Sequence, residues 1–167
     1  TSTSAAAASG AQAAAAGANR VDVSGVTGAT SITGAGSTDL VVVGIGTAVT
    51  SVDASAMTGA FSVDTTGTAA SLTSLKGGAG ADTITADAAD LKINATVQGG
   101  AGADTLDLAG SANKTLQLNM TGVETIDARD ISANTITMSL VNTTDFTTVN
   151  MTNPENGTTN MAGTLAL

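Results

Sequence analysis

The chain has no histidine, cysteine, tryptophan or tyrosine, and its 167 residues include one proline and two phenylalanines, Phe61 and Phe146. Without histidine and cysteine there are no imidazole bases, thiolate nucleophiles, tetrahedral zinc sites or disulfides. Most classes of enzyme are therefore excluded, and we expect no catalytic residues. With so few rings, the interior must be filled by Val, Ile, Leu, Met, Ala and threonine methyl groups, which favours thin layers over a thick globule.

Charged residues are also scarce, at 11% of the chain, and 14 acids against 5 bases give a net charge of -9. An acidic surface repels phosphate groups, so we expect no nucleic-acid partner. Hard divalent cations are suitable partners, because carboxylate and backbone oxygens are the ligands that calcium prefers. No apolar run approaches the roughly 20 residues of a membrane-spanning helix, so no membrane insertion is expected.

Composition divides the chain into two parts. Residues 1–19 are almost wholly Ala, Ser, Thr and Gly, which is typical of a linker or of the tail of a preceding module. In residues 20–167, aliphatic residues alternate with Thr, Ser, Asp and Asn between closely spaced glycines. This alternation with a period of two residues predicts short strands joined by tight turns. The chain begins without Met or a recognisable signal peptide, and we expect it to be a segment of a longer protein.

A triplet of a small hydroxyl residue, an aliphatic residue and a polar residue recurs at 51–53, 62–64, 83–85, 105–107, 125–127 and 148–150. Its aliphatic members Ile84, Leu106, Ile126 and Val149 follow one another after 22, 20 and 23 residues. This period is too short for a βα unit and fits one coil of a parallel β-solenoid, with two or three short strands and glycine-rich corners per coil. We therefore predict an all-β solenoid. An antiparallel, threonine-rich sandwich is the alternative.

Two segments, 77–85 and 99–107, read Gly-Gly-Ala-Gly-Ala-Asp-Thr-Ile-Thr and Gly-Gly-Ala-Gly-Ala-Asp-Thr-Leu-Asp. Both match the nonapeptide G-G-x-G-x-D-x-U-x, and the chain resembles calcium-binding RTX repeat proteins in these segments. The glycine-rich hexapeptide can form a tight turn with positive φ and exposed carbonyls, to which the Asp adds a carboxylate. A spacing of 22 residues puts one turn directly above the other, so a calcium ion between coils can take oxygens from both.

The resemblance implies calcium ligands in both copies and in the coil that follows: side-chain oxygens of Asp82 and Asp104, carbonyls of Gly77, Ala79, Gly99 and Ala101 or their neighbours, and, in a weaker second site, Glu124. The second site is weaker because residues 122–127 align with 102–107 but lack the glycine pair. RTX rolls ordinarily carry a nonapeptide on both sides of each coil. Since residues 86–98 contain none, calcium is expected on one edge only.

The alternative for the glycine runs is turn formation without any metal. The other aspartates of the coils are best interpreted as solvated strand-edge or turn residues: Asp53, Asp64, Asp87, Asp90, Asp127, Asp130 and Asp145. No Lys-Ser/Thr pair follows the glycines, so they do not form a phosphate-binding P-loop.

RTX repeats occur in type I-secreted toxins, proteases, lipases, adhesins and surface-layer proteins. The Thr/Ala/Gly-rich, cysteine-free, acidic composition is similar to that of the self-assembling surface-layer (S-layer) proteins of Gram-negative bacteria. This resemblance implies a secreted, non-catalytic structural segment at the bacterial cell surface, with calcium rigidifying the solenoid. Its partners would be copies of itself and neighbouring modules, and a cell-surface glycan would be bound through another part of the protein.

Two other functions remain open. One is an RTX adhesin or a calcium-dependent folding spacer of a type I-secreted exoprotein. The other is an ice-binding solenoid, which needs a flat array of Thr-x-Thr on every coil, whereas the copies at residues 83–85 and 135–137 are isolated.

Overall fold

The computed structural model describes residues 17–66, 71–110, 113–129, 136–141, 143, 145–152 and 165–166. Because these residues form only strands and turns, no helix that could cross a membrane occurs among them. The strands are β1 (Asn19–Asp22), β2 (Ser31–Gly36), β3 (Leu40–Val43), β4 (Ser51–Met57), β5 (Phe61–Asp64), β6 (Leu72–Lys76), β7 (Thr83–Asp87), β8 (Leu91–Gln98), β9 (Thr105–Ala109), β10 (Lys114–Thr121), β11 (Thr125–Arg129), β12 (Ile136–Val141), β13 (Thr148–Thr152) and β14 (Leu165–Ala166).

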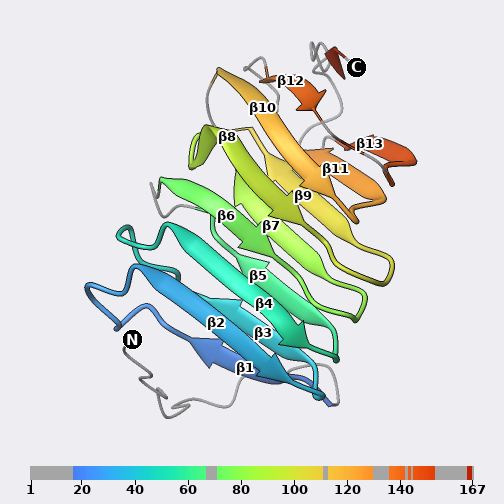
Figure 1. Ribbon diagram of the computed structural model, residues 1–167. Coiled ribbons are helices and arrows are strands. Elements are labelled where there is room, and N and C mark those ends of the chain that lie inside the picture. Colours follow the sequence, from blue (N-terminus) through green and yellow to red (C-terminus); the bar gives the residue numbers. More distant parts are fainter. Residues whose placement is uncertain are drawn as a thin grey trace.

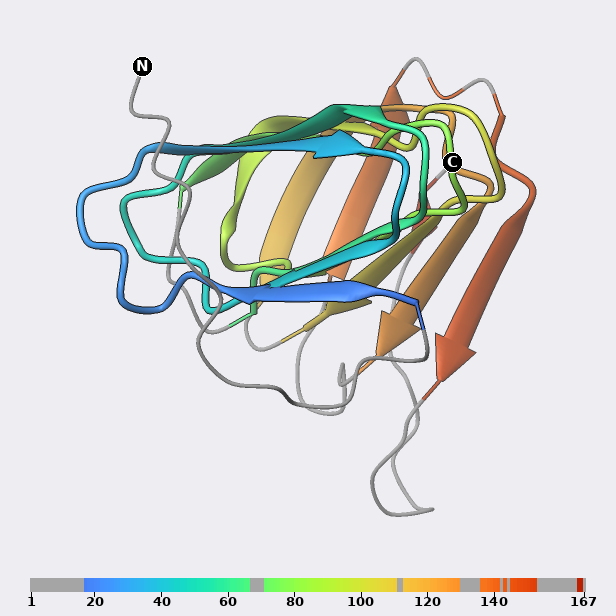
Figure 2. The same ribbon diagram turned by 90° about the horizontal axis from the view of Figure 1, so that it is seen from below.

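The odd-numbered strands form one parallel sheet in the order β1-β3-β5-β7-β9-β11-β13, and the even-numbered strands form a second in the order β14-β12-β10-β8-β6-β4-β2. We call these the odd sheet and the even sheet. The chain crosses between them after every strand, so two strands make each coil of a β-solenoid (Figure 1). Viewed along the stack, the two sheets face each other across a flattened interior (Figure 2). The predicted fold is confirmed, and the parallel pairing excludes the sandwich.

The repeat spacings in the sequence are the strand register of the structure. In the odd sheet, Ile84 pairs with Leu106 and Leu106 with Ile126, as the steps of 22 and 20 residues predict. In the even sheet, Val97 pairs with Met120. Since neighbouring strands lie about 4.8 Å apart, these side chains stack into continuous aliphatic columns.

The interior between the sheets is filled mainly by aliphatic residues from both. Leu106, Ile126 and Met120 have no exposed surface, and Phe61 is 1% exposed. This confirms the expectation that Val, Ile, Leu, Met and Ala form a thin core. Among the described residues Ile93 is the one large hydrophobic side chain that is exposed, at 49%.

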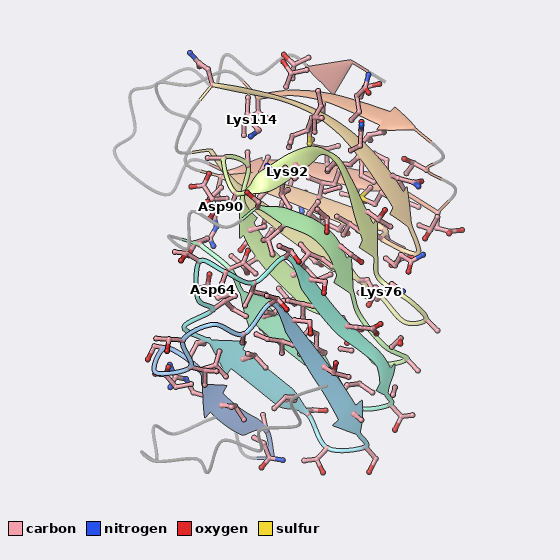
Figure 3. The ribbon with its side chains drawn as sticks, turned by 60° about the vertical axis from the view of Figure 1, so that its left-hand side comes forward. Asp64, Lys76, Asp90, Lys92 and Lys114 are labelled. Atoms are coloured by element: carbon pink, nitrogen blue, oxygen red, sulfur yellow. The ribbon has the colours of Figure 1, made fainter. Side chains whose placement is uncertain are left out.

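The two kinds of turn lie on opposite edges of the stack. Turns from the even sheet to the odd sheet, at 77–82, 99–104 and 122–124, lie on what we call the glycine edge. Figure 3 shows Lys76 beside this edge, and Asp90, Lys92 and Lys114 near the opposite one. Both nonapeptides therefore occupy the same edge. Of the predicted linker 1–19, residues 1–16 lie outside the described residues, and Asn19 is already the first residue of β1.

Two aspartates predicted to be solvated are in fact buried. Asp87 is 9% exposed and Asp90 is 6% exposed. The Ala89 N–H donates a 2.8 Å hydrogen bond to Asp87 Oδ1, so this carboxylate is satisfied by its own turn. The prediction was wrong because the sequence does not reveal how far a turn folds over the end of the core. Asp130, also predicted to be solvated, lies outside the described residues.

Candidate functional site

The glycines of the nonapeptides are required by how closely the coils stack. A Cβ on Gly77 would overlap the Gly99 carbonyl oxygen of the next coil, and a Cβ on Gly99 would overlap the Gly122 carbonyl oxygen. Gly100 and Gly102 have φ values of 113° and 130°, a region that L side chains rarely adopt. Backbone stacking alone therefore explains the glycine content of these turns, whether or not a metal binds there.

The three predicted acidic ligands lie in one column along the glycine edge. Asp82, Asp104 and Glu124 are the residues directly before β7, β9 and β11, and these strands pair at their first residues. The structure thus confirms the predicted register of the three acids on successive coils. We call them the carboxylate ladder.

Each carboxylate of the ladder accepts a hydrogen bond from the preceding coil. The Phe61 N–H donates to Asp82 Oδ1 at 2.7 Å, and the Asp82 N–H donates to Asp104 Oδ1 at 2.8 Å. The Asp104 N–H donates to Glu124 Oε2 at 2.7 Å. Hydrogen bonds with an ionised acceptor are stronger than neutral ones. The ladder therefore ties successive coils together at the start of the odd strands.

The second carboxylate oxygen distinguishes the two aspartates. In Asp82 it accepts a hydrogen bond from the Gly78 N–H. In Asp104, which is 3% exposed, Oδ2 has no hydrogen-bond partner. This oxygen and the Gly122 carbonyl oxygen both face the space where a Cβ of Gly99 would stand. Two oxygens that lie this close repel each other unless a proton or a cation lies between them, so a cation would be most favourable at this point of the edge.

Burial is the main reason that the pKa of Asp104 is raised to about 6, and the neighbouring charges of Asp82 and Glu124 act in the same direction. The hydrogen bond from the Asp82 backbone opposes this rise in pKa. The negative form of Asp104 is thus disfavoured in its present surroundings, and a positive charge beside Oδ2 would relieve that cost.

The predicted backbone ligands behave in two ways. The Gly99 carbonyl lies near Asp82 Oδ2, since both face the space left by the missing side chain of Gly77. Ala79 and Ala101, whose carbonyls were predicted as ligands, are exposed, and their N–H groups form hydrogen bonds. These donate to carbonyls of the preceding coil, to Met57 at 2.9 Å and to Gly78 at 3.0 Å, and so hold the turns in place.

Sequence reasoning missed the Gly122 carbonyl. The alignment placed Gly122 opposite Gly102, whereas the structure packs it against Gly100, because the turn at 122–124 is three residues long and the turn at 99–104 is six. Aligning Asp104-Thr105 with Glu124-Thr125 predicted the register of β11 correctly, but it did not predict the path of the shorter turn before it. Counting residues between Thr121, which pairs with Gln98, and Glu124 would have revealed it.

Two further acids on this edge accept backbone hydrogen bonds from a neighbouring coil, but only Asp145 does so in the direction of the ladder. Asp145 Oδ2 accepts a 3.2 Å hydrogen bond from the Gly122 N–H, again from the coil before it. Asp39, which ends the segment Gly34-Ala-Gly-Ser-Thr-Asp39 and directly precedes β3, accepts a 2.9 Å hydrogen bond from the Ala60 N–H of the coil after it. Asp39 therefore caps in the opposite direction and does not join the carboxylate ladder.

The site suits a cation held by few carboxylates. In the part of the chain that the structure describes, no three acidic side chains converge on one point. The unpartnered buried oxygen of Asp104 and the carbonyl oxygen of Gly122 beside it are nevertheless donors of the type that a hard cation takes, and its other ligands would be carbonyls or water. A groove of about 440 Å³ borders the glycine edge over Gly77, Gly78, Gly100 and Gly122, so water and ions reach the turns. No family model, curated protein or solved structure matches this chain.

Proposed function

We propose that the chain is a non-catalytic structural segment of a bacterial surface-layer protein, located at the cell surface, in which calcium at the glycine edge rigidifies the solenoid and supports self-assembly. One observation carries this proposal. Two matching nonapeptides stack on adjacent coils and leave the buried Asp104 Oδ2 without a partner beside the Gly122 carbonyl. Carboxylate and carbonyl oxygens are the ligands that calcium prefers.

The chemistry that calcium supplies when bound is positive charge between oxygens that otherwise repel. Asp104 Oδ2 and the Gly122 carbonyl would contribute to one site, and Asp82 with the Gly99 carbonyl would contribute from the coil before it. Because these oxygens come together only when the coils are stacked, binding stabilises the folded state by mass action. Extracellular calcium modules have dissociation constants of roughly 10⁻⁴–10⁻³ M, which suits a protein outside the cell.

The sheets also support a role in assembly. Parallel sheets are usually covered on both faces. Among the described residues, each sheet packs its inner face against the other sheet and no further element covers either outer face. These two faces are available to copies of the chain or to neighbouring modules of a longer protein.

Calcium dependence is tested by thermal melting of the whole chain, followed by circular dichroism, in calcium, in magnesium and in chelator. We expect calcium to raise the melting temperature at millimolar concentration and magnesium to raise it less. A melting temperature and β signal that are the same in all three conditions would overturn the calcium part of the proposal.

The choice between lattice and spacer is tested by negative-stain electron microscopy. Two-dimensional sheets that form with calcium and dissolve with chelator support the surface-layer role. A chain that folds with calcium but stays monomeric at every concentration favours the alternative, an RTX adhesin or a calcium-dependent folding spacer.

A further inference from the structure

Asparagine is followed two positions later by threonine far more often than composition requires. Threonine makes up 30 of the 167 residues, so about two such pairs are expected from the ten asparagines, and there are six. They begin at Asn94, Asn113, Asn119, Asn142, Asn150 and Asn156, and none has proline between its two members.

The structure describes four of these asparagines, Asn94, Asn113, Asn119 and Asn150, and all four are exposed. In the even sheet the middle residues of two triplets, Ala95 and Met120, are buried at 1% and 0% exposure. Since side chains alternate along a strand, the asparagine and the threonine of each triplet both point outward.

These two triplets are neighbours on the outer face of the even sheet. Asn119 in β10 pairs in register with Thr96 in β8, so the two acceptor asparagines lie on adjacent coils. Asn113 directly precedes β10, and Asn150 lies in β13 of the odd sheet. The acceptors gather on the coils from β8 onward. In the coils before β8 the one asparagine, Asn19, is followed by arginine and valine.

We propose that these asparagines are N-glycosylation sites, because Asn-x-Thr with a residue other than proline between is the acceptor sequence for this modification. The asparagine Nδ2 forms a bond to the anomeric carbon of a phosphate-activated sugar and gives up one proton. The bond between that carbon and the phosphate oxygen breaks, and its electron pair leaves with the phosphate. The sugar donor and the transferase are supplied by the producing cell.

Whether an acceptor asparagine lies inside a strand or outside one determines whether it must be modified before the chain folds. Asn94 and Asn119 lie inside strands whose amides take part in the parallel ladder, so a transferase reaches them before their coils close. Asn113 lies before its strand. Sugars at these positions would cover the outer face of β8 and β10 and leave that of β2 and β4 bare. The inference does not depend on calcium binding or on lattice formation.

The test is peptide mass spectrometry on the full chain isolated from the cells that make it. We expect added hexose-type mass on Asn94, Asn113, Asn119 and Asn150, and none on the exposed Asn19, which is the internal control. Four unmodified acceptors in this material would overturn the proposal.

Variants at Thr96 test the mechanism. Thr96→Val keeps the branched shape and removes the hydroxyl, so occupancy of Asn94 should fall to background, while Thr96→Ser should retain it. Occupancy of Asn119 in the same molecules should not change, which separates loss of the acceptor sequence from misfolding. Equal occupancy of Asn94 in both variants would contradict the assignment.

Discussion

The two nonapeptides share their first seven residues, yet their aspartates meet different surroundings. Asp82 has both oxygens bonded to backbone N–H groups, whereas Asp104 has one oxygen bonded and one bare. The partner that Asp104 lacks corresponds to the Gly78 N–H of the first turn, and the two turns differ in backbone conformation: Gly100 and Gly102 have positive φ, whereas the matching Gly78 and Gly80 do not. Beside the turn at 77–82 lies a second six-residue turn, but beside the turn at 99–104 lies the three-residue turn at 122–124. The same seven residues therefore adopt two backbone conformations on neighbouring coils, and the hydrogen bonding of the carboxylate differs with them.

The most severe way to break this arrangement is a side chain at Gly99. In Gly99→Ala the new Cβ would overlap the backbone oxygen of Gly122, which cannot move without unstacking the coil. Steric overlap with backbone in a packed region is among the costliest single changes, and we expect a loss of at least about 3 kcal/mol in the free energy of unfolding. Urea unfolding followed by circular dichroism measures it.

The matched control is Gly25→Ala. A Cβ at Gly25 has no atom within 4 Å and the residue does not have positive φ, so its stability should change by less than about 0.5 kcal/mol. Equal losses in the two variants would show that the glycine edge is not stacked as described.

Asparagine substitutions at Asp82 and Asp104 should change the stability of the chain in chelator in opposite directions. Asp82→Asn places an amide where two backbone N–H groups point, so one of them loses its acceptor and we expect a cost of about 1–3 kcal/mol in chelator. Asp104→Asn keeps the acceptor for the Asp82 N–H and lets its new NH₂ donate to the Gly122 carbonyl, so stability in chelator should be unchanged or higher. The same variant should lose most of the stabilisation by calcium. A loss of equal size for both variants in chelator would contradict the difference between the copies.

The sequence predicted the coils well and the chemistry of the turns less well. Spacing alone placed Ile84, Leu106 and Ile126 in one column, because a solenoid repeats its core residue on every coil. It could not show that Asp82 and Asp104 would accept backbone hydrogen bonds, since the donors are backbone N–H groups without a sequence signature. One donor to each aspartate lies in the preceding coil, and the second donor to Asp82 is Gly78 in the same turn. Nor could it show the unpartnered oxygen, because the two copies have the same residues but different backbone conformations at their glycines.

The pH dependence of stability sharpens the comparison further. The raised pKa of Asp104 means that the folded chain binds a proton more tightly than the unfolded chain does, so in chelator stability should rise as pH falls from about 6 toward the ordinary aspartate range. Burial also raises the pKa of Asp107, against the opposing effect of Arg129 2.6 Å away, and this adds a change of the same sign. Melting temperature measured between pH 7 and pH 4.5 follows both.

Two other aspartates do not interfere in this window. Hydrogen bonds from Ser24 and Ser55 lower the pKa values of Asp22 and Asp53, so their contribution to stability is lost only below the ordinary aspartate range. Asp104→Asn separates the contribution of Asp104 from that of Asp107. This variant should lose the part of the increase in stability at low pH that comes from Asp104 and keep the part that comes from Asp107. An unchanged pH profile in this variant would show that Asp104 titrates at its ordinary pKa.

The smallest expected effect is at the end of the ladder. Glu124→Gln keeps an oxygen that can accept the 2.7 Å hydrogen bond from the Asp104 N–H, so stability in chelator should change by less than about 1 kcal/mol. Its removed charge lies one coil away from the unpartnered Asp104 Oδ2, so calcium affinity should fall, but less than in Asp104→Asn. Isothermal titration of both variants in the same buffer gives the order directly. If Glu124→Gln weakens calcium binding as much as Asp104→Asn does, both acids contribute equally to the cation site, and the proposal that Asp104 is its main acidic ligand is wrong.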